Sequence, residues 1–234
     1  MIHDLENGIY YSDPVEATDR CCLTYIEGDN YSLMVDSGNS KRHYQQFYQQ
    51  LNKPEADFLI LTHSHWDHSY GLTFSNCESY CCSNTELHLL EDMNLSWDEE
   101  SVNKGYQQGT IDPFIGEAML EEYKGHFDEL RIKVPDIIFD QEIQFDLGGN
   151  VVIARHVTCP HCDDAVVIYC PKQKTLVIGD AACEELINGE WIDNVDKLKE
   201  FIAEINQFDY QWVIDGHSGL LSRDELEQWF KERL

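Results

Sequence analysis

The stretch LTHSHWDHSYG, Leu61 to Gly71, places three histidines and an aspartate within six residues. An apolar run, Phe58 to Leu61, precedes the first histidine and is typical of a buried strand. The backbone would therefore leave a sheet where these side chains begin, so that they can converge. A purely structural role is the alternative, but several buried histidines without partners would each be costly to desolvate. The pattern therefore favours a metal-binding turn over a polar loop.

Four side chains in this stretch are of metal-ligand type, namely His63, His65, Asp67 and His68. Imidazoles and a carboxylate, with no cysteine among them, suit zinc, iron or manganese, and the lack of further oxygen ligands disfavours calcium and magnesium. Neighbours such as Asp67 and His68 point in different directions and cannot all complete one unstrained tetrahedron. The spacing therefore predicts two adjacent ions.

Two ions need more ligands, and later predicted strands end close to suitable residues. His161 follows a strand that ends at His156, Asp180 follows Leu176 to Gly179, and His217 follows Trp212 to Ile214. Taken alone, Asp180 is better explained as a turn residue, and the segment around His217 is also an ordinary turn. The repetition of one ligand-type residue at each strand end favours a shared site.

With these residues together, the chain resembles the metallo-β-lactamase superfamily over roughly residues 8 to 220. The resemblance rests on four motifs and one turn: His63 to His68 as the HxHxDH motif, Thr158 to His161 in place of Thr-Pro-Gly-His, Gly179-Asp180, Gly216-His217, and Val35 to Gly38 as the strand and Asp-x-Gly turn before the first helix. It implies an α+β fold, a four-layer αβ/βα sandwich of two mixed β-sheets flanked by helices.

The resemblance also implies the ligands of a dinuclear centre: His63, His65 and His161 for one ion, Asp67, His68 and His217 for the other, and Asp180 bridging both. It implies a hydroxide between the ions as the nucleophile, with Asp67 as the catalytic residue that orients it and takes its proton. Two ions some 3.5 to 4 Å apart can activate water and stabilise the developing oxyanion. We expect two divalent ions, zinc first, with iron or manganese as alternatives.

The periodicity along the chain predicts a single domain, residues 1–234. Strands are predicted at 8–11, 21–27, 31–36, 57–62, 137–139, 143–147, 151–156, 165–170, 175–178 and 212–214. Helices are predicted at 40–51, 84–93 and 194–206, with a last helix capped by Ser222 and Glu225. In the second of these helices we expect Leu87, Leu90 and Leu89 to point inward.

Residues 94–135 differ in character and are read as an insertion or lid with some helix. Glycines and acidic residues are mixed there with isolated aromatics: Trp97, Tyr106, Phe114, Tyr123 and Phe127. Long insertions over a compact core are often lids or binding loops. In a lid, these aromatic side chains would line a substrate pocket. The alternative is that they pack on the domain as one face of amphipathic helices.

The charge balance limits the classes of molecule that the protein is expected to bind. Lys and Arg total 16 against 44 Asp and Glu, a formal charge of -28, with a pI near 4.4. Nucleic acids and anionic membranes need basic surfaces, so we expect neither, and a small-molecule substrate instead. An odd count of nine cysteines, no signal-peptide pattern after Met1, and no membrane-length apolar run predict a reduced, cytoplasmic protein.

Two cysteines flank one predicted ligand, as Cys159-Pro160-His161-Cys162. A CxxC spacing can bind zinc or cycle as a dithiol, but a complete structural zinc site would want a second such pair. The pair Cys81-Cys82 is adjacent rather than spaced. The role of Cys159 and Cys162 beside His161 is therefore left open.

Departures from relatives within this superfamily bear on the substrate. Three residues after Asp180, where many class B β-lactamases have a lysine for the drug carboxylate, this chain has Cys183, followed by Glu184 and Glu185. Only 17 residues follow His217, with few cations, so an anionic glutathione moiety is also disfavoured. We expect hydrolysis of an ester, lactone, thioester or amide bond in a small neutral or cationic molecule. The alternatives are a phosphodiesterase and a non-catalytic metal-binding or sensing protein of the same fold.

Overall fold

Two mixed β-sheets form the centre of the molecule in the computed structural model, which describes residues 1–187 and 190–234. The described strands of the first sheet follow chain order: β1 (Ile2–Asp4), β2 (Ile9–Ser12), β3 (Thr24–Glu27), β4 (Ser32–Val35), β5 (Phe58–Ile60), β6 (Glu78–Cys82) and β7 (Ile137–Phe139). Pairing is antiparallel from β1 to β4 and parallel from β4 to β7. The parallel half carries the stretch Leu61 to Gly71 after β5.

The second sheet has the order β15-β14-β11-β10-β9-β8. Its strands are β8 (Glu142–Asp146), β9 (Val151–His156), β10 (Val166–Cys170), β11 (Thr175–Gly179), β14 (Trp212–Asp215) and β15 (Gly219–Ser222). Only β11 and β14 pair in parallel. A separate hairpin, β12 (Glu185–Ile187) with β13 (Glu190–Ile192), was not predicted.

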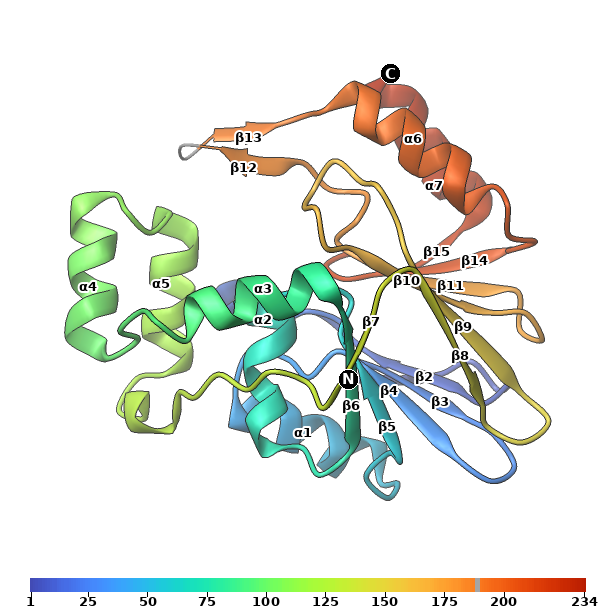
Figure 1. The fold of residues 1–234 in the computed structure, drawn as a ribbon, viewed down its shortest axis with the longest axis horizontal. Helices are drawn as coiled ribbons and strands as arrows, with labels where there is room; N and C mark the ends of the chain where they lie inside the picture. The colour runs from blue at the N-terminus through green and yellow to red at the C-terminus, as the bar shows by residue number, and fades with distance from the viewer. Residues whose placement is uncertain (188–189) are drawn as a thin grey trace.

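The strands alternate between two cores, because successive side chains point to opposite faces of a sheet. On β4, Leu33 and Val35 enter the core between the sheets, whereas Met34 faces the helices outside. On β14, Ile214 and Val213 divide in the same way. Both sheets are therefore buried on both faces, and the predicted four-layer sandwich is confirmed (Figure 1).

Helices cover the outer face of each sheet. The helices α1 (Lys41–Leu51) and α3 (Ser83–Asp92) pack on the first sheet, and α6 (Val195–Ile205) and α7 (Arg223–Arg233) pack on the second (Figure 1). In α1 the side chains of Tyr44, Phe47 and Leu51 are buried, and the Ser40 hydroxyl accepts the His43 N–H at the first turn. The predicted capping box of α7 is present.

The buried face predicted for the helix α3 was wrong. In α3, Leu87 and Leu90 are exposed, at 57% and 44%, whereas Leu89 is fully buried. The buried positions of this helix are Thr85 and Leu89, four residues apart on one face. A short helix that touches a sheet on one side buries only that narrow stripe, and Leu87 lies on the opposite side of the helix from Leu89.

Residues 94–135 contain α4 (Glu99–Gln108), α5 (Pro113–Glu122) and a 3-10 turn, η3 (Phe127–Glu129), which project from one side of the sandwich (Figure 1). They form a small core of their own, in which Tyr123 and Met119 are buried with Trp66 and Tyr70 of the stretch Leu61 to Gly71. Phe114, in contrast, is 42% exposed. The described segment therefore packs directly on the stretch with the predicted ligands, and a lid role stays a prediction.

A buried ion pair anchors this segment. The Glu122 carboxylate accepts from Arg20 Nε at 3.0 Å and Nη2 at 2.8 Å, and its side chain is 1% exposed. Removing one partner of a buried pair is strongly destabilising, so Glu122→Gln should lower the free energy of unfolding by about 3 kcal/mol in urea titrations. The neighbouring Glu121→Gln is the control, because its pair with Lys124 is exposed and contributes under about 1 kcal/mol. Equal changes in both variants would contradict this account.

None of the helices that the structure describes combines the length and the apolar character that crossing a bilayer requires.

Candidate metal centre

The stretch Leu61 to Gly71 leaves β5 and turns at once into the short helix α2 (Trp66–Ser69). The Ser69 hydroxyl donates to the carbonyl oxygens of Ser64, at 2.6 Å, and His65, at 3.0 Å, which closes the turn. The Thr62 carbonyl also accepts the N–H of Val166 at 2.7 Å, so the strand end is tied to β10 of the other sheet. The predicted ligands are thus held where both sheets end.

The first group of potential ligands is His63, His65 and His161, whose ligand atoms all lie within 4.8 Å of one another. His65 Nδ1 and His161 Nε2 are 3.0 Å apart, and the Glu184 carbonyl lies 2.8 Å from His161 Nδ1, which orients that ring. Burial, and then the charge of His161, lower the pKa of His65 to about 4. Its imidazole is therefore neutral at pH 7, the form that binds metals.

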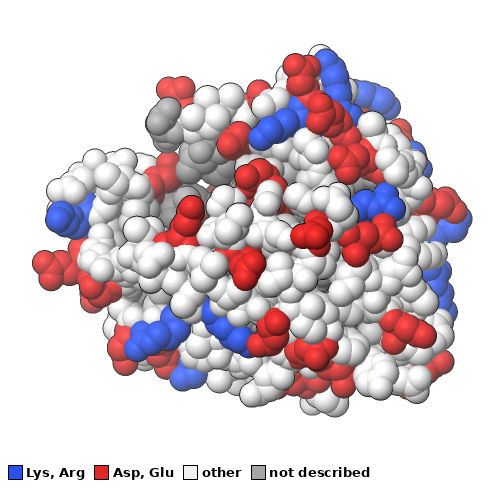
Figure 2. All heavy atoms as spheres, viewed as in Figure 1, with Lys and Arg blue, Asp and Glu red and all other residues white. Residues whose placement is uncertain are grey.

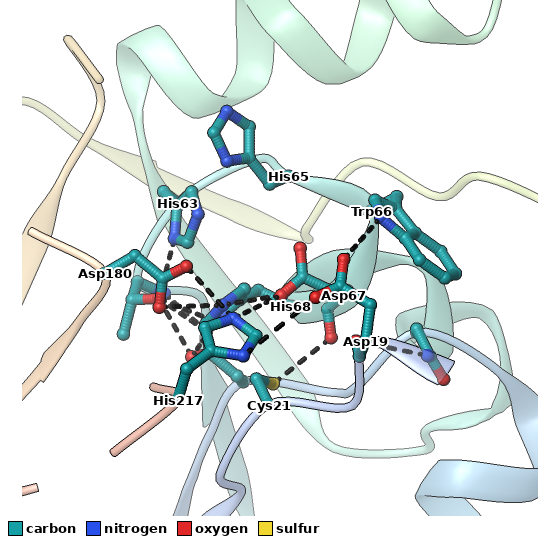
Figure 3. Close-up of polar contacts among 12 residues, drawn as sticks. Asp19, Cys21, His63, His65, Trp66, Asp67, His68, Asp180 and His217 are labelled. Atoms are coloured by element: carbon teal, nitrogen blue, oxygen red, sulfur yellow. Dashed lines mark hydrogen bonds and ion pairs between the residues drawn. The ribbon is translucent and has the colours of Figure 1, made fainter. Parts of the chain in front are cut away.

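The second group is Asp67, His68, Asp180 and His217, again with ligand atoms within 4.8 Å (Figure 3). His217 Nε2 lies 3.1 Å from Asp67 Oδ2 and 3.2 Å from Asp180 Oδ2. Burial alone would lower the pKa of His217, but the Asp180 and Asp67 carboxylates raise it to about 12. This pocket therefore stabilises positive charge strongly.

Asp180 lies between the two groups. Its Oδ1 is 3.3 Å from His68 Nε2, while its Oδ2 is 3.8 Å from His161 Nε2 of the first group. It follows β11, beside the glycine of the Gly216-His217 pair after β14. The strand ends thus bring all seven predicted ligands together, although their assignment as metal ligands stays a prediction.

The donor set fits divalent cations. Three buried atoms in it have no hydrogen-bond partner, namely His63 Nε2, His68 Nε2 and Asp180 Oδ1. A buried polar atom without a partner is costly, and each of these atoms is a nitrogen or oxygen that zinc, iron or manganese binds. Donor atoms on one tetrahedral ion lie roughly 3.3 Å apart, close to the separations within each group.

A further carboxylate, Asp36, orients the His68 ring through its Nδ1 atom. Its Oδ2 is 2.7 Å from His68 Nδ1, and it accepts the Thr62 N–H at 2.7 Å and the Thr62 hydroxyl at 2.8 and 3.0 Å. Such partners fix the ring and leave Nε2 for a metal. The sequence analysis used Asp36 only as part of a turn; its place at the end of β4 was the signal that could have revealed this role.

Asp19 is a second supporting carboxylate, and no sequence pattern pointed to it. It lies at the end of the 3-10 turn η1 (Glu16–Thr18), accepts the Trp66 indole N–H at 3.1 Å, and has Oδ1 4.0 Å from His217 Nδ1 (Figure 3). The Cys21 thiol was also missed; it donates to the Asp67 carbonyl at 3.2 Å.

Asp19→Asn removes the charge behind His217 and keeps an oxygen that can accept from Trp66. We expect the affinity for the second ion to fall about 10-fold, because outer carboxylates raise the basicity of ligating histidines. Competition with a chromophoric chelator measures this, with Asp13→Asn, an exposed aspartate paired with His3, as the control. An unchanged affinity in Asp19→Asn would refute the role.

Cys159 and Cys162 form no group of three or more potential ligands within the described residues. Cys159 is buried, and its thiol donates to the Cys162 carbonyl at 3.4 Å. This hydrogen bond spans the two residues on either side of Pro160-His161.

Comparisons with known proteins agree with this geometry. A sequence model of the metallo-β-lactamase superfamily matches residues 22–74, which include four of the seven predicted ligands. A metallo-β-lactamase from Pontibacter korlensis aligns with a TM-score of 0.69 at 14% identity, covering 99% of this chain and 97% of that one. The chain has the fold of the metallo-β-lactamases, and part of its sequence matches the model of that superfamily. The resemblance stated from the motifs is thus confirmed.

Two further solved structures share this fold. A superfamily protein from the archaeon Sulfolobus tokodaii aligns with a TM-score of 0.62 at 21% identity, covering 96% of this chain and 85% of that one. The inverting sec-alkylsulfatase Pisa1 from Pseudomonas sp. aligns with a TM-score of 0.72 at 16% identity and 99% coverage of this chain. This chain spans only 40% of that enzyme's length. A search of curated protein sequences gave no match.

Proposed function

We propose that this protein is a metal-dependent hydrolase with two divalent ions that cleaves an ester, lactone, thioester or amide bond in a small neutral or cationic substrate. The observation that carries the proposal is the position of Asp180, one carboxylate that reaches ligand atoms of both groups at 3.2 to 3.8 Å. A single residue that faces both groups supports a paired centre over two unrelated sites. The match of residues 22–74 to the superfamily model and the His/Asp donor set support metal-dependent hydrolysis in general.

Each predicted ligand has a place in this proposal. His63, His65 and His161 would hold one ion, and Asp67, His68 and His217 the other, with Asp180 shared. Paired ions lower the pKa of bound water and stabilise negative charge on the group under attack. No serine or cysteine nucleophile is then needed.

Asp67 is the residue we propose as catalytic. Its Oδ2 lies 3.0 Å from His68 Nε2 and 3.1 Å from His217 Nε2. Burial alone would raise the pKa of Asp67, but His68 and His217 hold that pKa below its usual range, so the carboxylate is ionised. An ionised, oriented carboxylate beside the ions can align the attacking water and accept its proton.

The charge around the centre supports the substrate class. Glu184 and Glu185 follow Asp180 closely, and Figure 2 shows acidic side chains scattered across the face drawn, with Lys and Arg side chains among them. The chain as a whole carries a formal charge of -28. A field of this sign repels anionic substrates and concentrates cationic ones. Such a field disfavours carboxylate-bearing drugs, sulfate esters and phosphodiesters as substrates, and it favours neutral or cationic molecules.

A substrate panel tests the proposal. Wild type and Asp180→Asn, both loaded with zinc, would be assayed in parallel on uncharged aryl esters, lactones, thioesters, β-lactams, sulfate esters and phosphodiesters. We expect hydrolysis of a neutral ester, lactone, thioester or amide by the wild type and its loss in the variant. Hydrolysis of phosphodiesters alone would replace the proposal by a phosphodiesterase. Bound ions without hydrolysis of any class would favour a binding or sensing protein.

A further inference from the structure

A second cluster of metal-ligand side chains lies outside the centre described above. It consists of His88 on α3 and of Asp163 and Asp164 in the loop between His161 and β10. One ligand atom from each lies within 4.8 Å of the other two, and His88 Nε2 is 2.6 Å from Asp163 Oδ1. None of the three belongs to the seven predicted ligands.

Asp164 is unusual in this cluster because it is a buried carboxylate, 1% exposed, that is only partly satisfied. Its Oδ2 accepts the Ser64 N–H at 2.8 Å, but its Oδ1 is buried without a hydrogen-bond partner. A buried anionic oxygen without a partner is costly unless a positive charge compensates it. A cation shared with His88 and Asp163 would supply that charge.

The loop is held firmly against α3. The Asp163 carbonyl accepts from Asn84 Nδ2 at 2.8 Å and lies 2.9 Å from His156 Nε2, while the Asp164 carbonyl accepts from the Thr85 hydroxyl at 3.4 Å. These contacts fix the backbone on both sides of the two carboxylates. The approach of His88 to this loop is therefore part of the fold and does not depend on flexible side chains alone.

We propose that His88, Asp163 and Asp164 bind a third divalent cation of the zinc or manganese class. One imidazole and two carboxylates are donors that such ions take, and waters can complete the shell. Donors on one zinc ion lie roughly 3.3 Å apart, so the His88–Asp163 pair would open by less than about 1 Å. Both side chains are exposed enough to do so, at 40% and 65%.

The ion would have a structural effect on the main centre. Asp164 already holds the N–H of Ser64, between two predicted ligands, and it follows His161 by three residues. A cation bound by both His88 and Asp164 would link α3 to the loop that carries Ser64 and to the loop that carries His161. It would lie on the helix side of those loops, where it acts on positioning and touches no substrate.

Zinc binding at buffered free concentrations tests the proposal by counting bound ions per chain. We expect His88→Ala and Asp163→Asn each to bind one ion fewer than the wild type. His3→Ala is the matched control, because His3 and Asp13 form a similarly exposed pair at 2.5 Å with no buried carboxylate beside it, and it should bind as the wild type does. Equal stoichiometry in the wild type, His88→Ala and Asp163→Asn would overturn the proposal.

A second measurement separates this ion from the main centre. In a His65→Ala background, added zinc should still raise the melting temperature, because a ligand that binds the folded state stabilises it. The rise should become smaller when His88→Ala is added to that background, because the group of Asp67, His68, Asp180 and His217 is intact in both variants, and circular dichroism verifies that both variants fold. A zinc-dependent rise of the same size in the double variant would also overturn the proposal.

Discussion

Replacing Asp180 with asparagine should lower the metal content of the purified protein and reduce hydrolysis by at least about 100-fold. Loss of an outer partner of a ligand weakens metal binding 10- to 100-fold, and a direct ligand shared by two ions should matter more. The Asp180 carboxylate lies close to both groups, with His68 on one side and His161 on the other. The asparagine has nearly the same shape but carries no charge.

Elemental analysis and single-substrate kinetics on the same preparation measure both effects. Asp196→Asn, at a side chain that is 94% exposed, is the control and should change neither quantity. His65→Ala removes a ligand of the first group only, so the structure predicts a smaller loss of metal than in Asp180→Asn. Full metal content in Asp180→Asn would show that the carboxylate is not a ligand.

Gly216→Ala should abolish metal binding while most of the fold remains. A Cβ at this position would lie 2.0 Å from Asp180 Oδ1 and 3.0 Å from His68 Cε1, so it would enter the space between two predicted ligands. The backbone cannot retreat easily, because the Gly216 carbonyl accepts from Cys22 at 2.7 Å and its N–H donates to Gly179 at 2.9 Å. The methyl group must therefore displace Asp180.

Metal content and circular dichroism on Gly216→Ala test this expectation. Gly109→Ala is the control, because a Cβ at this position would meet nothing within 4 Å. Gly109 has a positive φ of +69°, so the substitution should cost only about 1 kcal/mol of backbone strain. That variant should lose a little stability and no metal. Two tightly bound ions in Gly216→Ala would contradict the geometry derived for Asp180.

The predicted ligands could be proposed from the sequence because each follows an apolar strand. His161, Asp180 and His217 were placed by that rule before any geometry was known, and the sheets bring them together with the stretch Leu61 to Gly71. Most strands of the two sheets were predictable because alternating or continuous apolar runs mark burial, but β1, β6 and β15 were not predicted. Helix α1 was predictable for a similar reason, since Tyr44, Phe47 and Leu51 repeat at helical spacing.

The supporting contacts could not be predicted in the same way. Asp19 reaches His217 across 198 positions of the chain from a short 3-10 turn, and such a turn has no periodicity to read. The buried face of α3 is set by the side of the helix that meets the sheet. Leu87, Leu89 and Leu90 lie within four residues and point in different directions, so their spacing does not identify that side. The joint packing of Trp66 with Met119 and Tyr123 is likewise a contact between distant segments.

Anomalous diffraction at the absorption edge of the bound metal would show whether these seven side chains hold two ions. We predict two peaks within this cluster: one beside His63, His65 and His161, and one beside Asp67, His68 and His217, with Asp180 in contact with both. The count does not depend on any ion at His88, which would give a separate peak. A single peak in the cluster, or none after growth with added zinc, iron and manganese, would contradict the account.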